Sequence, residues 1–126
     1  MIVGVGVDIL ELKKLQSILD FVGQRFLNKV YTKPELRYIR DETNLSHLAT
    51  TFAGKEAVFK TLGSLGIDIV DWREIEILRK KNGKPFVRFR GKLKNQVSKQ
   101  GSFSILISMT ATSDLAIGLA ILKQNE

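Results

Sequence analysis

The sequence contains no cysteine, a single histidine and only two prolines in 126 residues. Without cysteine there is no disulfide framework, thiolate metal site or cysteine nucleophile. The lone His47 excludes a zinc site built from several histidines, so a bound metal has to be held by carboxylates, which favours Mg²⁺. No run of about 18 apolar residues marks a membrane span. Met1 leads into a short apolar run without a basic leader, so we expect a cytoplasmic protein.

Positive charge is abundant, and the apolar content is moderate. Lys and Arg number 20 against 13 acidic residues, which leaves a formal net charge of +7, and 44% of the residues are hydrophobic. This composition excludes disorder and fits one domain over residues 1–126 with a modest core. The charge favours an anionic partner, such as a nucleic acid, a phosphate-bearing ligand or an acidic protein.

Hydrophobic periodicity predicts an α+β fold with a mainly antiparallel sheet packed against a long central helix. The central helix carries apolar residues at helical spacing, with Gly63 as a candidate C-cap. Asn82-Gly83 is a typical hairpin turn between two short strands. In chain order we expect a strand at 2–7, helices from Leu12 and at 34–40, the central helix at 45–62, strands at 74–79 and 86–89, a short helix at 91–100, and strands at 102–110 and 115–122.

Two carboxylates stand at informative positions, and each allows two interpretations. Asp8 ends the first apolar run, where it is either the N-cap of the next helix, with Glu11 in a capping box, or a metal ligand at a sheet edge. Glu56 lies about 40° from Phe52 on the helical wheel, beside the apolar stripe. It either pairs with Lys60 at i+4 or joins Asp8 in holding one Mg²⁺, with Lys60 directed at a phosphate.

Four segments resemble motifs of the bacterial holo-[acyl-carrier-protein] synthases, the short-chain branch of the 4′-phosphopantetheinyl transferases. Together they span most of the chain in the right order. They are Gly4-Val5-Gly6-Val7-Asp8-Ile9-Leu10-Glu11-Leu12, Phe52-Ala53-Gly54-Lys55-Glu56-Ala57-Val58-Phe59-Lys60, the turn Asn82-Gly83-Lys84-Pro85, and Ile107-Ser108-Met109-Thr110.

The resemblance implies the 4′-phosphopantetheinyl transferase fold and a Mg²⁺-dependent reaction that supports fatty acid biosynthesis. Phosphopantetheine would pass from coenzyme A to a serine of apo-acyl carrier protein, releasing adenosine 3′,5′-bisphosphate. It also implies homotrimers with active sites between subunits. Asp8 and Glu56 become Mg²⁺ ligands, Lys60 a diphosphate contact, and Lys13 and Lys14 the carrier-protein dock. The implied coenzyme A contacts are Lys60, Gly63, Lys84, Pro85, Ser108 and Thr110.

Three positions depart from the family pattern. Thr51 replaces an Arg that many members carry, and Ala111 replaces a His; both positions are associated with binding coenzyme A. The loop Gly63-Ser64-Leu65-Gly66-Ile67 is one residue longer than usual. The base that accepts the serine proton stays open between Glu56 and a water on the metal ion.

Two other functions are compatible with parts of the sequence. A small nucleic-acid-binding module would explain the charge, but no basic-aromatic motif is present, so we expect neither a nucleic-acid nor a membrane partner. The second function is that of a family member that binds coenzyme A without transferring its phosphopantetheine. The changes at Thr51 and Ala111 are compatible with it.

Overall fold

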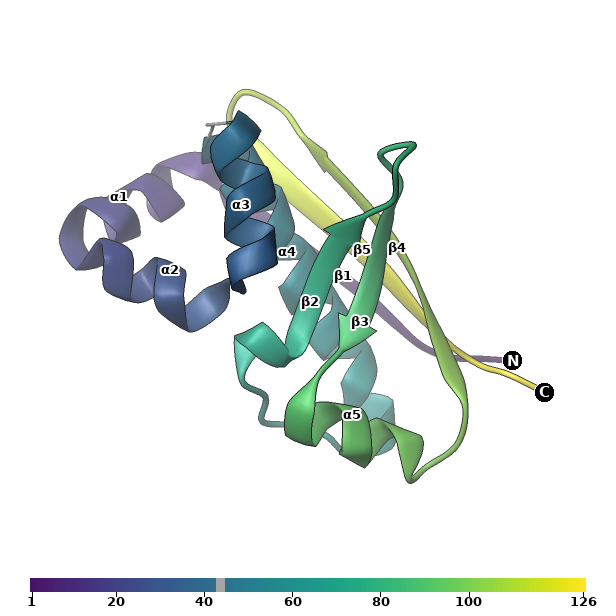
Figure 1. Cartoon of the computed structure of the whole chain (residues 1–126). Coiled ribbons are helices and arrows are strands. Elements are labelled where there is room, and N and C mark those ends of the chain that lie inside the picture. Colours follow the sequence, from purple (N-terminus) through teal and green to yellow (C-terminus); the bar gives the residue numbers. More distant parts are fainter. Residues whose placement is uncertain (43–44) are drawn as a thin grey trace.

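A computed structural model of the chain describes residues 1–42 and 45–126, with side chains described throughout these ranges except at 40–42. Figure 1 shows the arrangement of the elements. In chain order they are β1 (Ile2–Glu11), α1 (Leu12–Val22), α2 (Gln24–Val30), α3 (Lys33–Glu42), α4 (Leu45–Thr61), the 3₁₀ turns η1 (Leu62–Leu65) and η2 (Trp72–Glu74), β2 (Ile75–Arg79), β3 (Pro85–Phe89), α5 (Gly91–Ser98), β4 (Phe103–Ala111) and β5 (Leu115–Gln124).

The strands form two antiparallel sheets, which confirms the expected α+β class with a mainly antiparallel arrangement. β1, β5 and β4 make a three-stranded sheet in that order, and β2 and β3 make a separate hairpin. The long helix α4 lies between the three-stranded sheet and the hairpin (Figure 1). No helix among the described residues is long and apolar enough to cross a membrane.

Helix α4 is buried on two opposite sides, and a different kind of residue lies on each side. Its sheet-facing side is built from small residues, among them Ala53, Gly54 and Ala57, all buried. The large apolar side chains predicted from the sequence face the opposite way, where Phe52 and Phe59 each meet the Trp72 ring edge-on at 5.6 Å between centroids. The central helix is therefore confirmed, but its sheet-facing side is not its bulky apolar stripe.

Three expectations about element ends are wrong. β1 does not end at Asp8 but continues to Glu11, because β5 pairs with it along its whole length. Asp8 is therefore not a helix N-cap. Glu11 takes that position without a capping side-chain hydrogen bond, so the capping box is also absent. Gly63 lies inside η1, whereas Gly66, at φ +72°, is the left-handed C-cap. The short helix α2 was not expected from the sequence.

Candidate active site

Asp8 reaches helix α4 because glycines remove side chains between the helix and the sheet. Asp8 pairs with Gly118 of β5 and lies on the helix-facing side of β1, as Gly6 does. A Cβ on Gly118 would lie 2.5 Å from the carbonyl oxygen of Ala53 and 2.7 Å from the amide nitrogen of Gly54, and one on Gly6 would overlap the carbonyl oxygen of Ala57. The glycines thus permit a backbone approach that no larger residue allows.

We predict that Gly118→Ala lowers the free energy of unfolding by about 1–3 kcal/mol, because the added methyl group has to push α4 off the sheet. The same shift separates Asp8 from Glu56. Urea unfolding measures the first effect. Gly63→Ala is the matched control for stability, since a Cβ there meets nothing within 4 Å. Equal unfolding midpoints for the two variants would contradict the close-packing argument.

The carboxylates of Asp8 and Glu56 and the ammonium of Lys60 gather where β1 meets α4. Lys60 Nζ donates to Asp8 Oδ1 at 3.0 Å and to the backbone oxygen of Val7 at 2.9 Å. The Asp8 side chain is 15% exposed and that of Lys60 is 52% exposed. The interpretation of Lys60 as the i+4 partner of Glu56 is therefore incorrect, since its ion pair is with Asp8 on the neighbouring strand.

The negative charge of Glu56 is disfavoured in this cluster. Burial, followed by the charge and hydrogen bonding of Asp8, raises the pKa of the Glu56 carboxyl to about 7, and the charge of Lys60 only partly opposes this. Two carboxylates that disfavour each other's charge, next to a single ammonium, form a site that gains from a further cation.

The donor set fits Mg²⁺. Among the described side chains, no group of three or more His, Cys, Asp or Glu is assembled that could hold an ion alone. Mg²⁺ commonly takes only one or two protein carboxylates and completes its shell with water and substrate phosphates. Asp8 and Glu56 match that pattern, and their mutual repulsion is the observation that favours a cation between them.

The other residues singled out in the sequence lie away from this cluster. Lys84 is exposed at the tip of the β2–β3 hairpin, and Pro85 begins β3. Ser108 and Thr110 are exposed on β4. In the sheet register Asp8 aligns with Gly118 and then Met109, so Ser108 and Thr110 point to the opposite face from Asp8.

Nearer to the cluster, Gly63 follows α4 and is exposed, while Lys13 and Lys14 are exposed on α1, directly after β1. Lys14 Nζ lies 3.6 Å from Glu11 Oε1. One chain therefore brings Asp8, Glu56 and Lys60 together, with Gly63, Lys13 and Lys14 on the elements that follow, but leaves the hairpin and β4 residues elsewhere.

A buried ion pair next to Glu56 was missed by the sequence reasoning. Lys55 Nζ lies 2.8 Å from Glu35 Oε1 and donates to the backbone oxygens of Trp72 (2.9 Å) and Ile75 (2.7 Å). Burial raises the pKa of Glu35, and the Lys55 ammonium opposes that rise. On the helical wheel Lys55 falls about 20° from Leu48, inside the apolar stripe. A charged residue inside an apolar stripe was the sequence signal for a buried ion pair.

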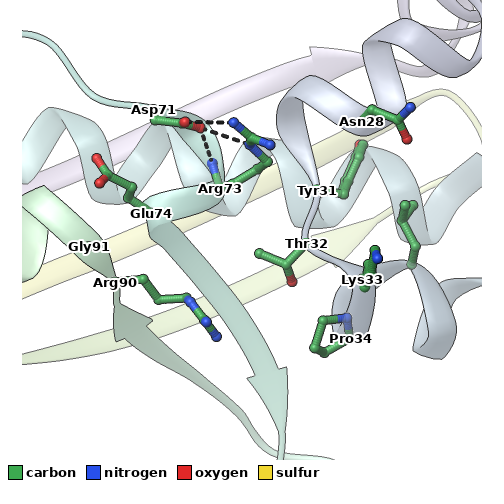
Figure 2. A pocket seen from close by; sticks show the side chains of 11 residues that line it. Asn28, Tyr31, Thr32, Lys33, Pro34, Asp71, Arg73, Glu74, Arg90 and Gly91 are labelled. Atoms are coloured by element: carbon green, nitrogen blue, oxygen red, sulfur yellow. Dashed lines mark hydrogen bonds and ion pairs between the residues drawn. The ribbon is translucent and has the colours of Figure 1, made fainter.

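A cavity of about 730 Å³ lies between the α2–α3 corner, η2 and the β3–α5 junction (Figure 2). Its acidic groups are engaged within the chain. Asp71 accepts from Arg73 at 2.9 Å, and Glu74 Oε2 accepts from the Lys92 backbone nitrogen at 2.8 Å. None of the residues predicted as site residues lines it.

Known proteins are similar to this chain in sequence and in fold. Residues 4–120 match the family model of the 4′-phosphopantetheinyl transferase superfamily. A holo-[acyl-carrier-protein] synthase of Clostridium kluyveri is 38% identical over 125 residues, 98% of this chain and 91% of that protein. One from Halothermothrix orenii is 35% identical over 122 residues, 96% of this chain and 97% of that protein.

Solved structures agree with this. The crystal structure of the holo-[acyl-carrier-protein] synthase from Neisseria meningitidis superposes with a TM-score of 0.87 at 27% identity, covering 98% of this chain and 100% of that one. The coenzyme A complex of the Chronobacterium ammoniagenes protein superposes with a TM-score of 0.88 at 24% identity, covering 98% of each chain. The chain therefore belongs to the 4′-phosphopantetheinyl transferase superfamily and, within it, to the holo-[acyl-carrier-protein] synthases.

Proposed function

We propose that this chain transfers 4′-phosphopantetheine from coenzyme A to a serine of apo-acyl carrier protein in a Mg²⁺-dependent reaction, in the cytoplasm, to supply fatty acid biosynthesis. The observation that carries the proposal is the cluster of Asp8, Glu56 and Lys60, in which two mutually repelling carboxylates stand beside an ammonium that can reach solvent. The coenzyme A complex of a relative with the same fold supports coenzyme A as the donor.

The residues divide the chemistry between them. Asp8 and Glu56 hold the ion, which when bound neutralises charge on the diphosphate, and the half-exposed Lys60 binds the same diphosphate as a point charge. The serine oxygen forms a bond to the phosphorus that carries pantetheine, the bond from that phosphorus to the bridging oxygen breaks, and adenosine 3′,5′-bisphosphate leaves. The serine proton passes either to Glu56 or to a water molecule in the site.

Intact mass measurement tests the activity. Incubation with coenzyme A, Mg²⁺ and apo-acyl carrier protein should add about 340 Da to the carrier, the mass of the transferred group. A carrier of unchanged mass would overturn the proposal, and coenzyme A binding without transfer would identify an inactive family member. Binding to generic duplex DNA that weakens steeply with salt, without coenzyme A affinity, would favour the nucleic-acid alternative.

We further propose a homotrimer with shared active sites, and the outer face of the three-stranded sheet supports it. Helix α4 covers one face of that sheet, while large apolar side chains are exposed on the strands: Val5 (62%), Val7 (53%), Ile9 (61%), Leu106 (54%) and Leu119 (39%). An apolar patch of this kind is typical of a protein–protein interface. Ser108 and Thr110 lie on the exposed side of β4, so a neighbouring subunit can meet them there.

Mixed oligomers test the shared site. A Glu56→Gln subunit and a Lys84→Glu subunit carry their defects on different sides of a shared site. After co-refolding at equal amounts, about a quarter of the sites should combine two intact sides, since each side is intact with a chance of one half. The mixture should then exceed the mean rate of the two parents. A rate equal to that mean, or a monomeric mass in solution, would overturn the proposal.

The carrier protein is proposed to dock on α1 through Lys13 and Lys14. Both lysines are exposed, and α1 begins directly after the strand that carries Asp8, so a bound carrier would lie close to the carboxylates. Opposite charges across such a surface mainly accelerate association. The net charge of +7 is consistent with an acidic partner.

The pH dependence follows from the raised pKa of Glu56. Since this pKa is raised from 4.5 to about 7, the folded chain binds more protons than the unfolded chain between these values, and this group's contribution to stability falls as the pH rises through them. We predict that without metal the wild type loses stability between about pH 5 and pH 8 relative to Glu56→Gln. Urea unfolding at about pH 5 and pH 8 provides the measurement. An equal change in the free energy of unfolding between these pH values in the two proteins would contradict the prediction.

A further inference from the structure

The buried ion pair between Glu35 and Lys55 joins four elements of the fold; we call this pair and the backbone groups that it binds the Lys55 junction. The Lys55 side chain is 0% exposed and that of Glu35 is 1% exposed. Lys55 belongs to α4 and Glu35 to α3. The Lys55 ammonium also binds the backbone oxygens of Trp72 in η2 and Ile75 in β2, so its three protons have three acceptors.

The acidic half of the junction is bound as completely as the basic half. Glu35 Oε2 accepts from the backbone nitrogen of Ile77 at 2.8 Å, and Oε1 accepts from the backbone nitrogen of Thr32 at 2.7 Å. Apart from the ion pair itself, every hydrogen bond of the junction ends on a backbone atom. The junction therefore fixes the relative positions of main-chain segments.

Stability alone does not explain a buried ion pair of this kind. Removing two charges from water costs about as much free energy as their attraction returns, and apolar residues of similar volume often stabilise a fold equally well. Hydrogen bonds depend on direction, however, whereas apolar contacts tolerate small rotations. The Lys55 junction is therefore suited to fix the orientation of α4.

Helix α4 is also held from its other side at the same level. Gly118 brings β5 against the backbone of Ala53 and Gly54, directly before Lys55. The turn of α4 that carries Glu56 is thus fixed from two sides. Because a side-chain tip lies about 5–6 Å from the helix axis, a rotation of α4 by about 20° would move the Glu56 carboxylate by about 2 Å.

Tyr31 lies close both to the junction and to Glu56. Lys55 Nζ is 5.9 Å from the centroid of the Tyr31 ring, and Tyr31 Oη donates to the backbone oxygen of Leu48 at 2.6 Å. Burial, followed by the charges of Glu35 and Glu56, raises the pKa of the Tyr31 hydroxyl. The junction and the Glu56 carboxylate therefore share a neighbouring side chain, besides being adjacent in the helix.

We propose that Lys55 and Glu35 are positioning residues: their junction sets the rotation of α4 and so holds the Glu56 carboxylate where it can bind one ion together with Asp8. The inference rests on the proposed function, because it concerns the proposed ion site. Loss of a group that orients a metal ligand typically costs about 10- to 100-fold in metal affinity or activity, and a misplacement of about 1 Å can cost as much.

The double variant Lys55→Met with Glu35→Leu tests this, because it removes both charges and leaves neither buried alone. We expect the folded variant to bind Mn²⁺, which prefers the same oxygen ligands as Mg²⁺, about 10- to 100-fold more weakly than the wild type. The electron paramagnetic resonance signal of free Mn²⁺ measures this affinity. The kcat should fall by a similar factor, whereas KM for the carrier protein should stay within about twofold, since the proposed dock on α1 lies outside the junction.

A second double variant, Lys55→Gln with Glu35→Gln, keeps polar groups at both positions without the charges. It should retain more of the Mn²⁺ affinity than the apolar double variant, because part of the directed hydrogen bonding is restored. If the apolar double variant does not fold, the polar one provides the same comparison with the wild type.

Leu122→Ala is the control for a general loss of stability. Leu122 is buried in β5, four residues along the strand from Gly118, and aligns with Gly4 and Ile105 in the sheet. This variant should unfold at a lower urea concentration but bind Mn²⁺ within about twofold of the wild type. If Leu122→Ala weakened Mn²⁺ binding as much as the double variants do, the positioning role would be refuted.

A crystal structure of the folded double variant provides a readout that depends on neither transfer nor metal. The Glu56 carboxylate should be displaced relative to Asp8. Unchanged positions of both carboxylates, or wild-type Mn²⁺ affinity and kcat, would overturn the inference. If the wild type did not modify the carrier protein, the proposed function would fail, whereas the Mn²⁺ affinities and the crystal structure would still decide the role of the Lys55 junction.

Discussion

Replacing Asp8 by Asn, or Glu56 by Gln, is expected to lower the transfer rate by about a thousandfold or more while the chain still folds. Each exchange removes one of the two carboxylates that we propose to hold the ion, and with it the proposed neutralisation of charge on the diphosphate. The rate is read from the mass of the carrier protein over time, and folding from circular dichroism. Asp68→Asn is the control, since Asp68 is exposed in the loop that follows η1. Rates close to wild type in both site variants would refute the assignment of the ion site.

The stability of the same variants separates a functional role from a structural one. In the metal-free chain Glu56→Gln should not lower the free energy of unfolding near neutral pH, because it removes a charge that burial and then the neighbouring Asp8 disfavour, the two causes that raise the pKa of Glu56. Asp8→Asn also weakens the 3.0 Å pair with Lys60. A large loss of stability in Glu56→Gln would show that this carboxylate holds the fold together, contrary to the proposal.

Lys55→Met is expected to have the largest effect on stability, a loss of about 3–5 kcal/mol, because it leaves the Glu35 carboxylate buried without its cation. For a small domain with about 5–15 kcal/mol in total this is a major fraction. The lost contacts include the backbone oxygens of Trp72 and Ile75, so α4 is also released from η2 and β2. Urea unfolding at equilibrium provides the measurement.

Two further variants make this prediction specific. Lys99→Met removes an exposed lysine after α5 and should change stability by less than about 0.5 kcal/mol. The double variant Lys55→Met with Glu35→Leu removes both buried charges and should recover part of the loss. A loss below about 1 kcal/mol in Lys55→Met would mean that the buried pair contributes little.

Several structural features were readable from local sequence. Antiparallel strands, the hairpin at Asn82-Gly83 and helix α4 followed from periodicity and turn residues, because these depend on neighbours in the chain. Asp8 and Glu56 were recognisable because a carboxylate beside an apolar stripe needs a partner. The local interpretation of Asp8 as a helix cap was wrong, since it could not include the pairing with β5, whose residues lie near the other end of the chain.

The sequence by itself therefore determined the fold class and the family and singled out Asp8 and Glu56, because propensity, periodicity and motif spacing are properties of short segments. Only the tertiary structure decided which groups meet. In the folded chain Lys60 forms an ion pair with Asp8, and the buried Lys55 forms one with Glu35. Ser108 and Thr110 lie on the face of the sheet opposite Asp8. Strand register and the approach of a helix to a sheet are set by contacts between distant segments, and a one-residue shift in register would reverse the face of every side chain.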